Sequence, residues 1–192
     1  MKVGIISDTH DDLDRLRKAI EIFKQEQVAY IIHAGDYIFP GIIEEFRELL
    51  LQHDSEQDNP RKTNIKLIGV LGNNDGEKLK LKEKFQELGG QLEEHFLKVS
   101  IDNRVFGIYH GTNENLRDAI LLCGQYDVFV HGHTHIRYKE RHGRTLVLNP
   151  GTAHKNFPDN QGNIQNIPSI MIYDTADDNC KIIDIEKNTV LN

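Results

Sequence analysis

The chain has 192 residues, of which 38% are hydrophobic and 28% charged, so we expect a single folded domain over 1–192 and exclude a chain that is disordered throughout. Its 23 basic and 30 acidic residues give a net charge of −7, which argues against binding of extended nucleic acid through many phosphates. The longest apolar runs fall far short of the ~20 residues that a membrane span needs, so we expect no membrane contact.

The first half of the chain alternates short apolar runs with amphipathic segments. This pattern predicts strands at 2–7, 28–33 and 65–71 and helices at 11–27, 41–52 and 77–88, the last one stopped by Gly89 and Gly90. Such alternation indicates parallel strands joined by helical crossovers. The charged segment 77–87 is expected to be a solvated helix face.

The second half is richer in strands. The sequence predicts strands at 93–101, 104–109, 127–131, 136–141, 144–148, 168–175 and 180–186, and one helix at 114–123. Asp102-Asn103 and His142-Gly143 predict hairpin turns. Segments 53–64 and 154–167 are polar and without periodicity, so we expect mobile surface loops there.

Clusters of polar residues follow the predicted strands. They are Asp8-Thr9-His10, Gly35-Asp36, Gly72-Asn73-Asn74-Asp75, Tyr109-His110-Gly111 and Gly132-His133-Thr134-His135. Ligands of an open α/β sheet bind outside the carboxyl ends of its strands, so these clusters are expected to share one crevice. The chain has ten histidines, an excess that indicates a site, because imidazole is the commonest metal ligand.

Seven side chains in these clusters offer oxygen or nitrogen ligands, which is more than one ion needs. They are Asp8, His10, Asp36, Asn73, His110, His133 and His135. Asp8 and His10 are two residues apart, which in extended backbone places both side chains on one side of the chain, and His133 and His135 share this spacing. A carboxylate can bridge, so we expect two divalent ions around Asp36, with Mn, Fe, Zn, Co or Ni preferred over Mg or Ca.

The ordered motifs D-x-H, G-D, G-N-x-[DEH], H-G and G-H-x-H resemble those of the calcineurin-like metallophosphoesterases, and the short chain is similar to their small prokaryotic phosphodiesterase branch. Asn149-Pro150-Gly151 is similar to a turn after the family's last motif. The resemblance implies a four-layer α/β sandwich of two mixed β-sheets flanked by helices. It also implies one ion held by Asp8, His10, Asp36 and His135, and a second held by Asp36, Asn73, His110 and His133.

The resemblance implies hydrolysis of phosphodiesters, and the ligand set indicates a metal-dependent hydrolase with a hydroxide that bridges two metal ions as nucleophile. Mn²⁺ is the first choice of metal, and Ni²⁺, Zn²⁺, Fe²⁺, Co²⁺ and Mg²⁺ stay open. Many relatives carry a His after the motif Asn as the proposed general acid, where this chain has Asn74, and an amide cannot donate a proton at neutral pH. Asp75 or a metal-bound water could replace it, or the substrate has a leaving group that needs little protonation. The predicted catalytic residues are Asp36, Asn73, Asn74, Asp75 and His110.

Other functions stay open. The same fold resembles a eukaryotic retromer subunit with a decayed metal centre, so a non-catalytic protein-binding scaffold is one alternative, although the intact ligand set argues against it. A phosphomonoesterase is a second. A nuclease related to the DNA-repair members is disfavoured by the short chain and the net charge of −7. We expect a small phosphodiester substrate, and a homo-oligomer stays open.

The remaining cysteines and histidines bear on location and packing. Cys123 and Cys180 are expected to be two buried thiols in a reducing compartment, and the N-terminus lacks the apolar segment of a secretion signal, which together predict a cytoplasmic protein. His33 and His131 precede Asp36 and His133 in apolar runs, so they either orient a ligand or pack in the core. Four others are expected to be ordinary surface residues: His53, His95, His142 and His154.

Overall fold

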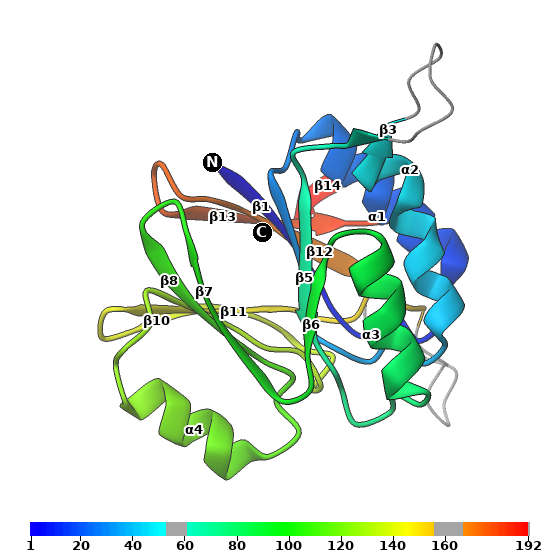
Figure 1. The fold of residues 1–192 in the computed structure, drawn as a ribbon. Coiled ribbons are helices and arrows are strands. Elements are labelled where there is room, and N and C mark those ends of the chain that lie inside the picture. Colours follow the sequence, from blue (N-terminus) through cyan, green and yellow to red (C-terminus); the bar gives the residue numbers. More distant parts are fainter. Residues whose placement is uncertain (53–60, 156–166, 192) are drawn as a thin grey trace, which may run out of the picture.

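The computed structural model describes residues 1–52, 61–155 and 167–191. Two β-sheets pack face to face, and helices cover the outer face of each sheet (Figure 1). These helices are α1 (Leu13–Gln25), α2 (Arg47–Leu50) and α3 (Lys78–Glu87) on one side and α4 (Glu114–Leu122) on the other. The four-layer sandwich is therefore confirmed. None of the described helices has the length and apolar character needed to cross a membrane.

The first sheet has seven strands in the order β14-β13-β12-β1-β2-β5-β6. Their bounds are β1 Lys2–Ile6, β2 Tyr30–His33, β5 Lys66–Val70, β6 Gln91–Glu93, β12 Ser169–Asp174, β13 Asn179–Asp184 and β14 Thr189–Leu191. Strands β1, β2, β5 and β6 run parallel, as the alternation predicts, whereas β12 joins β1 antiparallel. The sheet is therefore mixed, and the carboxyl ends of β1, β2 and β5 lie at one edge.

The helices on the first sheet differ from the prediction in one place. Instead of a helix over 41–52, the chain forms a 3-10 helix η1 (Pro40–Phe46), the single turn α2 and a short strand β3 (Leu51–Gln52), which pairs with β4 (Arg61–Lys62). Buried Ile43, Phe46 and Leu49 are spaced by three residues, which suits the three residues per turn of a 3-10 helix as well as an α-helix. In α3 the predicted solvated face is confirmed apart from buried Leu81 and Phe85.

The second sheet has five strands in the order β10-β11-β9-β8-β7. Their bounds are β7 Phe96–Ile101, β8 Arg104–Tyr109, β9 Val128–Val130, β10 Arg137–His142 and β11 Thr145–Pro150. The predicted strand 93–101 corresponds to β7, which begins at Phe96, and the sequence analysis missed β6 of the first sheet, which shares only Glu93 with the predicted range. The Asp102-Asn103 turn is confirmed, whereas the second turn is Gly143-Arg144, because His142 still pairs with Thr145.

Among the residues that the structure describes, three apolar cores separate the four layers. Alternating side chains of β1 illustrate this: Val3 and Ile5 pack between the two sheets, whereas Ile6 packs under the helices. Gly4 also faces the helices, and a Cβ there would lie 2.6 Å from the ring of Phe23. The third core lies between the second sheet and α4.

Several smaller predictions can be compared with the structure. Cys180 is buried, but the expectation for Cys123 is wrong: it is exposed, since it follows α4, none of whose described residues is fully buried. The predicted loop 53–64 contains strand β4, and residues 53–60 and 156–166 lie outside the described residues. His95 and His142 are exposed as predicted, and His53 lies outside the described residues.

Candidate metal centre

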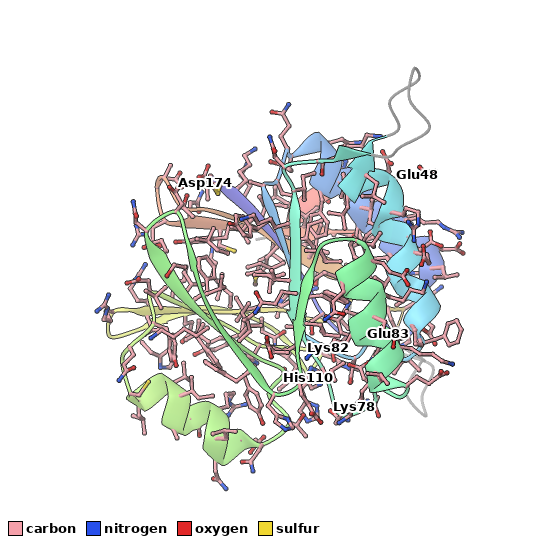
Figure 2. The ribbon with its side chains drawn as sticks, in the orientation of Figure 1. Glu48, Lys78, Lys82, Glu83, His110 and Asp174 are labelled. Atoms are coloured by element: carbon pink, nitrogen blue, oxygen red, sulfur yellow. The ribbon has the colours of Figure 1, made fainter. Side chains whose placement is uncertain are left out.

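The polar clusters that follow the strands converge at one edge of the two packed sheets. Asp8, His10 and Asp36 follow strands β1 and β2 of the first sheet, and Asn73 follows β5. His110 follows β8 of the second sheet, and His133 and His135 lie between β9 and β10. Figure 2 shows His110 on the lower side of the molecule, near the loop into α3 that carries Asn73, and His110 Nε2 lies 3.1 Å from Asn73 Oδ1. Both sheets therefore contribute to the centre.

Three potential ligands form a first group. His135 Nε2 lies 3.3 Å from Asp8 Oδ1, and His10 Nε2 lies 3.2 Å from His135 Nε2 and 3.9 Å from Asp8 Oδ1. Asp8 is fully buried, yet its Oδ1 accepts no hydrogen bond from any residue that the structure describes. Burial of a carboxylate oxygen that accepts no hydrogen bond is costly, so this group fits a cation between Asp8, His10 and His135.

A second group lies around His110. Its Nε2 is 3.4 Å from Asp36 Oδ2, and the rings of His110 and His133 lie edge to face, with centroids 5.2 Å apart. His110 Nδ1 lies 2.7 Å from the Ala34 carbonyl oxygen. When Nδ1–H donates to that oxygen, the lone pair of Nε2 is left for a metal, which is the usual arrangement of a metal-bound histidine. One ligand atom from each of Asp8, Asp36 and His110 lies within 4.8 Å of the others, close enough to hold a divalent ion.

Asp36 lies between the two groups. Its Oδ2 is 3.7 Å from His10 Nε2 of the first group and 3.4 Å from His110 Nε2 of the second. Burial opposes ionisation of Asp36, but hydrogen bonds and charge from His110 and hydrogen bonds from Asn74 outweigh it and hold the pKa of this carboxyl well below its ordinary value. A buried, ionised carboxylate therefore occupies the position that a bridging ligand requires.

The ligand-bearing loops have unusual backbone conformations. The φ angles are 54° at Asp8, 44° at His10, 59° at Asp36, 67° at His133 and 58° at His135. The argument from extended backbone is therefore wrong, and His133 and His135 turn to different groups, His133 toward His110 and His135 toward Asp8. Left-handed conformations of such residues cost about 1–3 kcal/mol each and persist only where the surroundings impose them.

Hydrogen bonds between loops and the absence of side chains at two glycines impose these conformations. The Asp8 amide donates to the Gly35 carbonyl at 2.9 Å, and the His133 amide donates to Asp8 Oδ2 at 3.1 Å. A Cβ on Gly132 would lie 1.9 Å from Ser7 Oγ, and a Cβ on Gly72 would lie 2.1 Å from Asp36 Oδ1. The glycines of the G-N and G-H motifs thus allow the ligand loops to approach closely.

Asn74 and Asp75 both hold Asp36 in place. Asn74 donates from its backbone amide to Asp36 Oδ1 at 2.9 Å and from Nδ2 to Oδ2 at 2.8 Å. Buried Asp75 accepts hydrogen bonds from four backbone amides: Gly72 at 2.6 Å, Asp36 at 3.2 Å, Tyr37 at 2.6 Å and Ile38 at 2.9 Å. Burial and the charge of Asp36 raise the pKa of Asp75, while the amides of Ile38, Gly72 and Tyr37 oppose the rise. Both oxygens of Asp75 are thus used to join the loops after β2 and β5.

Further residues surround the centre, and sequence reasoning missed one of them, His154. The prediction of an ordinary surface position for His154 is wrong, because its ring is half-buried and lies 5.2 Å from the ring of His10. Asn149 donates from Nδ2 to the Gly132 carbonyl at 3.0 Å and to Thr134 Oγ1 at 3.0 Å. The signal for Asn149 was the Asn149-Pro150-Gly151 motif, but the expected turn is wrong at its first two residues, because Asn149 and Pro150 end strand β11 and pair with β10. His131 is buried against this loop, and burial lowers its pKa to about 4.

Comparison with known proteins agrees with this geometry. A family model described as the calcineurin-like phosphoesterase superfamily domain matches residues 1–178. Phosphodiesterase MJ0936 of Methanocaldococcus jannaschii is 39% identical over 176 residues, which are 91% of this chain and 93% of that protein. Phosphodiesterase YfcE of Escherichia coli is 27% identical over 159 residues, 80% of this chain and 79% of its own.

Solved structures show the same fold. An archaeal phosphodiesterase superposes over the full length of both chains with a TM-score of 0.79 and 37% identity. Vps29 of Entamoeba histolytica, complexed with zinc, covers 100% of this chain and 96% of its own with a TM-score of 0.62, but at 18% identity it is evidence for the fold alone. The match of the family model and the close relative show that the chain belongs to the calcineurin-like phosphoesterase superfamily.

Proposed function

We propose that the protein is a dinuclear metal-dependent phosphodiesterase. The observation that carries the proposal is the position of Asp36, whose Oδ2 lies within 3.7 Å of His10 Nε2 and 3.4 Å of His110 Nε2. One carboxylate thus joins two groups of ligands, as a two-ion hydrolase requires. The names of the relatives MJ0936 and YfcE, both phosphodiesterases, support the same activity.

The two groups would hold one ion each. The first is proposed to use Asp8, His10, Asp36 and His135, and the second Asp36, Asn73, His110 and His133. When bound, two divalent ions supply positive charge for the phosphoryl oxygens and a nucleophile at neutral pH. Mixed nitrogen and oxygen donors favour Mn²⁺ as the first choice, with Ni²⁺, Zn²⁺, Fe²⁺, Co²⁺ and Mg²⁺ as alternatives. The ions would also offset the negative charge of an acidic chain where a phosphate binds.

The residues of the chain orient the reacting groups. Asp36 and Asn73 face His110, and Asn74 holds both carboxylate oxygens of Asp36. An amide cannot act as a general acid, so Asn74 cannot supply the ~10²–10⁴-fold increase in reaction rate that a general acid gives. We therefore propose that substrates have good leaving groups. Asn73 and Asn74 are exposed, which leaves the centre open on that side for the second ester group of a small phosphodiester.

The experiment compares two substrates on metal-stripped protein. Bis(p-nitrophenyl) phosphate and p-nitrophenyl phosphate are each supplied with Mn²⁺, Ni²⁺, Zn²⁺, Fe²⁺, Co²⁺ or Mg²⁺. We expect metal-dependent turnover that is faster with the diester. Faster hydrolysis of the monoester would assign a phosphomonoesterase instead, and no turnover with any ion would favour the protein-binding scaffold.

A pair of variants tests the role of Asp36. Asp36→Asn keeps the shape of the side chain but removes the charge that would bridge two ions, so we expect diester turnover to fall at least about 100-fold. Asp174→Asn is the matched control, because Asp174 is paired with Lys2 at the start of β1 and Figure 2 shows it on the side of the molecule opposite His110. Equal loss in both variants would contradict the assignment.

A cytoplasmic location and a single domain remain predictions.

A further inference from the structure

We propose that His33 and Thr9 form a brace, here named the His33–Thr9 brace, that positions the ligands Asp8, His10 and Asp36 before a metal ion binds. The inference rests on the proposed metal centre and extends it to two residues that are not ligands. Both are buried, with 1% of their surface exposed. They connect the loop after β1 with the loop after β2.

The hydrogen bonds of the brace run in one direction. The Gly35 amide donates to His33 Nδ1 at 3.2 Å, so Nδ1 is an acceptor. A neutral imidazole with an accepting Nδ1 carries its proton on Nε2, and His33 Nε2 therefore donates to Thr9 Oγ1 at 3.1 Å. The Thr9 hydroxyl in turn donates to the Asp36 carbonyl at 3.3 Å. Each donor in this series of three hydrogen bonds has one acceptor, and this assigns the His33 tautomer with its proton on Nε2.

The brace acts where the two ligand loops are joined. The Asp36 carbonyl that accepts from Thr9 also accepts from the His10 amide at 3.1 Å, and the Asp8 amide donates to the Gly35 carbonyl at 2.9 Å. Thr9 lies between these two backbone hydrogen bonds. Since Asp8, His10 and Asp36 all have left-handed backbone, removal of the Thr9 hydroxyl would leave this unfavourable conformation with fewer contacts to hold it.

His33 itself is held firmly. Its ring stacks on Tyr37, with centroids 3.8 Å apart and an angle of 26° between the planes, and Tyr37 Oη donates to the His33 carbonyl at 3.1 Å. A Cβ on Gly69 would lie 2.2 Å from Tyr37 Oη, so the neighbouring strand leaves room for the tyrosine. Burial lowers the pKa of His33 far below its ordinary value, which agrees with a neutral ring. His33 is therefore a fixed support for Thr9.

The test measures affinity for Mn²⁺, by competition with a chromophoric chelator, in three threonine variants. Thr9→Val has nearly the same volume but lacks the hydroxyl, and we expect its Mn²⁺ affinity to fall about 10- to 100-fold, the usual effect of residues that orient metal ligands. Thr9→Ser restores the hydroxyl and should bind within about threefold of the wild type. Thr145→Val is the control, because Thr145 of β11 in the second sheet is also buried and its hydroxyl donates at 2.7 Å to the Tyr126 carbonyl.

Thermal unfolding of the same variants separates positioning from stability. Thr9→Val and Thr145→Val should lower the Tm by similar amounts, whereas only Thr9→Val should lose Mn²⁺ affinity. Equal Mn²⁺ affinity of Thr9→Val and the wild type, or equal loss in Thr145→Val, would overturn the brace while the proposed function stands. A wild type that binds no divalent ion would instead overturn the proposed function, and the brace with it.

A substitution of His33 tests the other residue of the His33–Thr9 brace. His33→Gln keeps a donor but cannot also offer an acceptor at the position of Nδ1, so we expect it to lose Mn²⁺ affinity as Thr9→Val does. This result would support the brace even if Thr9→Val folded poorly. Wild-type affinity in His33→Gln would contradict it.

Discussion

Substitution of Gly72 by alanine tests how closely Asp36 must be positioned. The added Cβ would lie 2.1 Å from Asp36 Oδ1 and 2.5 Å from the Asp36 amide nitrogen, whereas real Cβ contacts essentially never fall below 3.0 Å. The Asp36 carboxylate must therefore move by about 0.9 Å. A displacement of ~1 Å in a catalytic group costs on the order of 100-fold in rate, so we expect that loss in diester turnover, and a destabilisation of about 1–3 kcal/mol from overpacking.

The matched control lies in the same loop. A Cβ on Gly76 would meet nothing within 4 Å, so Gly76→Ala should turn over the diester at nearly the wild-type rate. The assay is the Mn²⁺-dependent hydrolysis of bis(p-nitrophenyl) phosphate at saturating metal, together with urea unfolding of the metal-free proteins. Equal turnover of Gly72→Ala and Gly76→Ala would refute the reasoning that links the position of Asp36 to activity.

Three further predictions address the support of Asp36, the charge of one surface cluster and the effect of metal. Asn74→Ala removes the hydrogen bond from Nδ2 to Asp36 Oδ2 and should weaken Mn²⁺ binding about 10-fold or more; unchanged affinity in a metal titration would contradict this. Hydrogen bonds from Arg47 and Lys84 lower the pKa of Glu44 from 4.5 to about 2, so its ion pairs stabilise the fold above pH 4.5 and this contribution is lost as the pH falls towards 2. Because Glu44 is 36% exposed, we expect these ion pairs to contribute at most about 1 kcal/mol to the free energy of unfolding. Urea unfolding should show this difference between the wild type and Glu44→Gln at pH 7, and the difference should vanish near pH 2. Mn²⁺ at 100 times its Kd should stabilise the protein by about 2.7 kcal/mol, and calorimetry that shows the same Tm with and without the ion would argue against a native-state site.

The sequence predicts the fold well where the pattern of apolar residues fits only one type of secondary structure. The continuous apolar runs of β1, β2 and β5, each followed by a helical segment, are compatible only with parallel strands covered on both faces. The spacing of Ile43, Phe46 and Leu49 is shared by two helix types, so the 3-10 helix could not be distinguished from an α-helix. Strand β6 was missed because its three residues, Gln91–Glu93, are too few to show the alternation that marks a strand.

For the candidate site as well, the sequence predicts where the ligand residues lie but not the contacts that hold them. The positions of the seven ligand candidates follow from the strand ends, but the left-handed backbone of Asp8 or His133 depends on contacts with loops far away in the chain. The supporting contacts of Asn74 and Asp75 reach a loop almost 40 residues earlier in the chain. No local pattern contains such a partner, and the same holds for His154.

The distribution of the ligands over both sheets has a consequence for folding. Asp8 and Asp36 come from the first sheet, and His110, His133 and His135 come from the second. Neither sheet alone carries a complete set of the proposed ligands, so we expect tight uptake of a metal ion only after the two sheets have docked. The rate at which refolding protein binds Mn²⁺ would therefore report the rate at which the two sheets dock. A bound ion would also slow the separation of the sheets during unfolding.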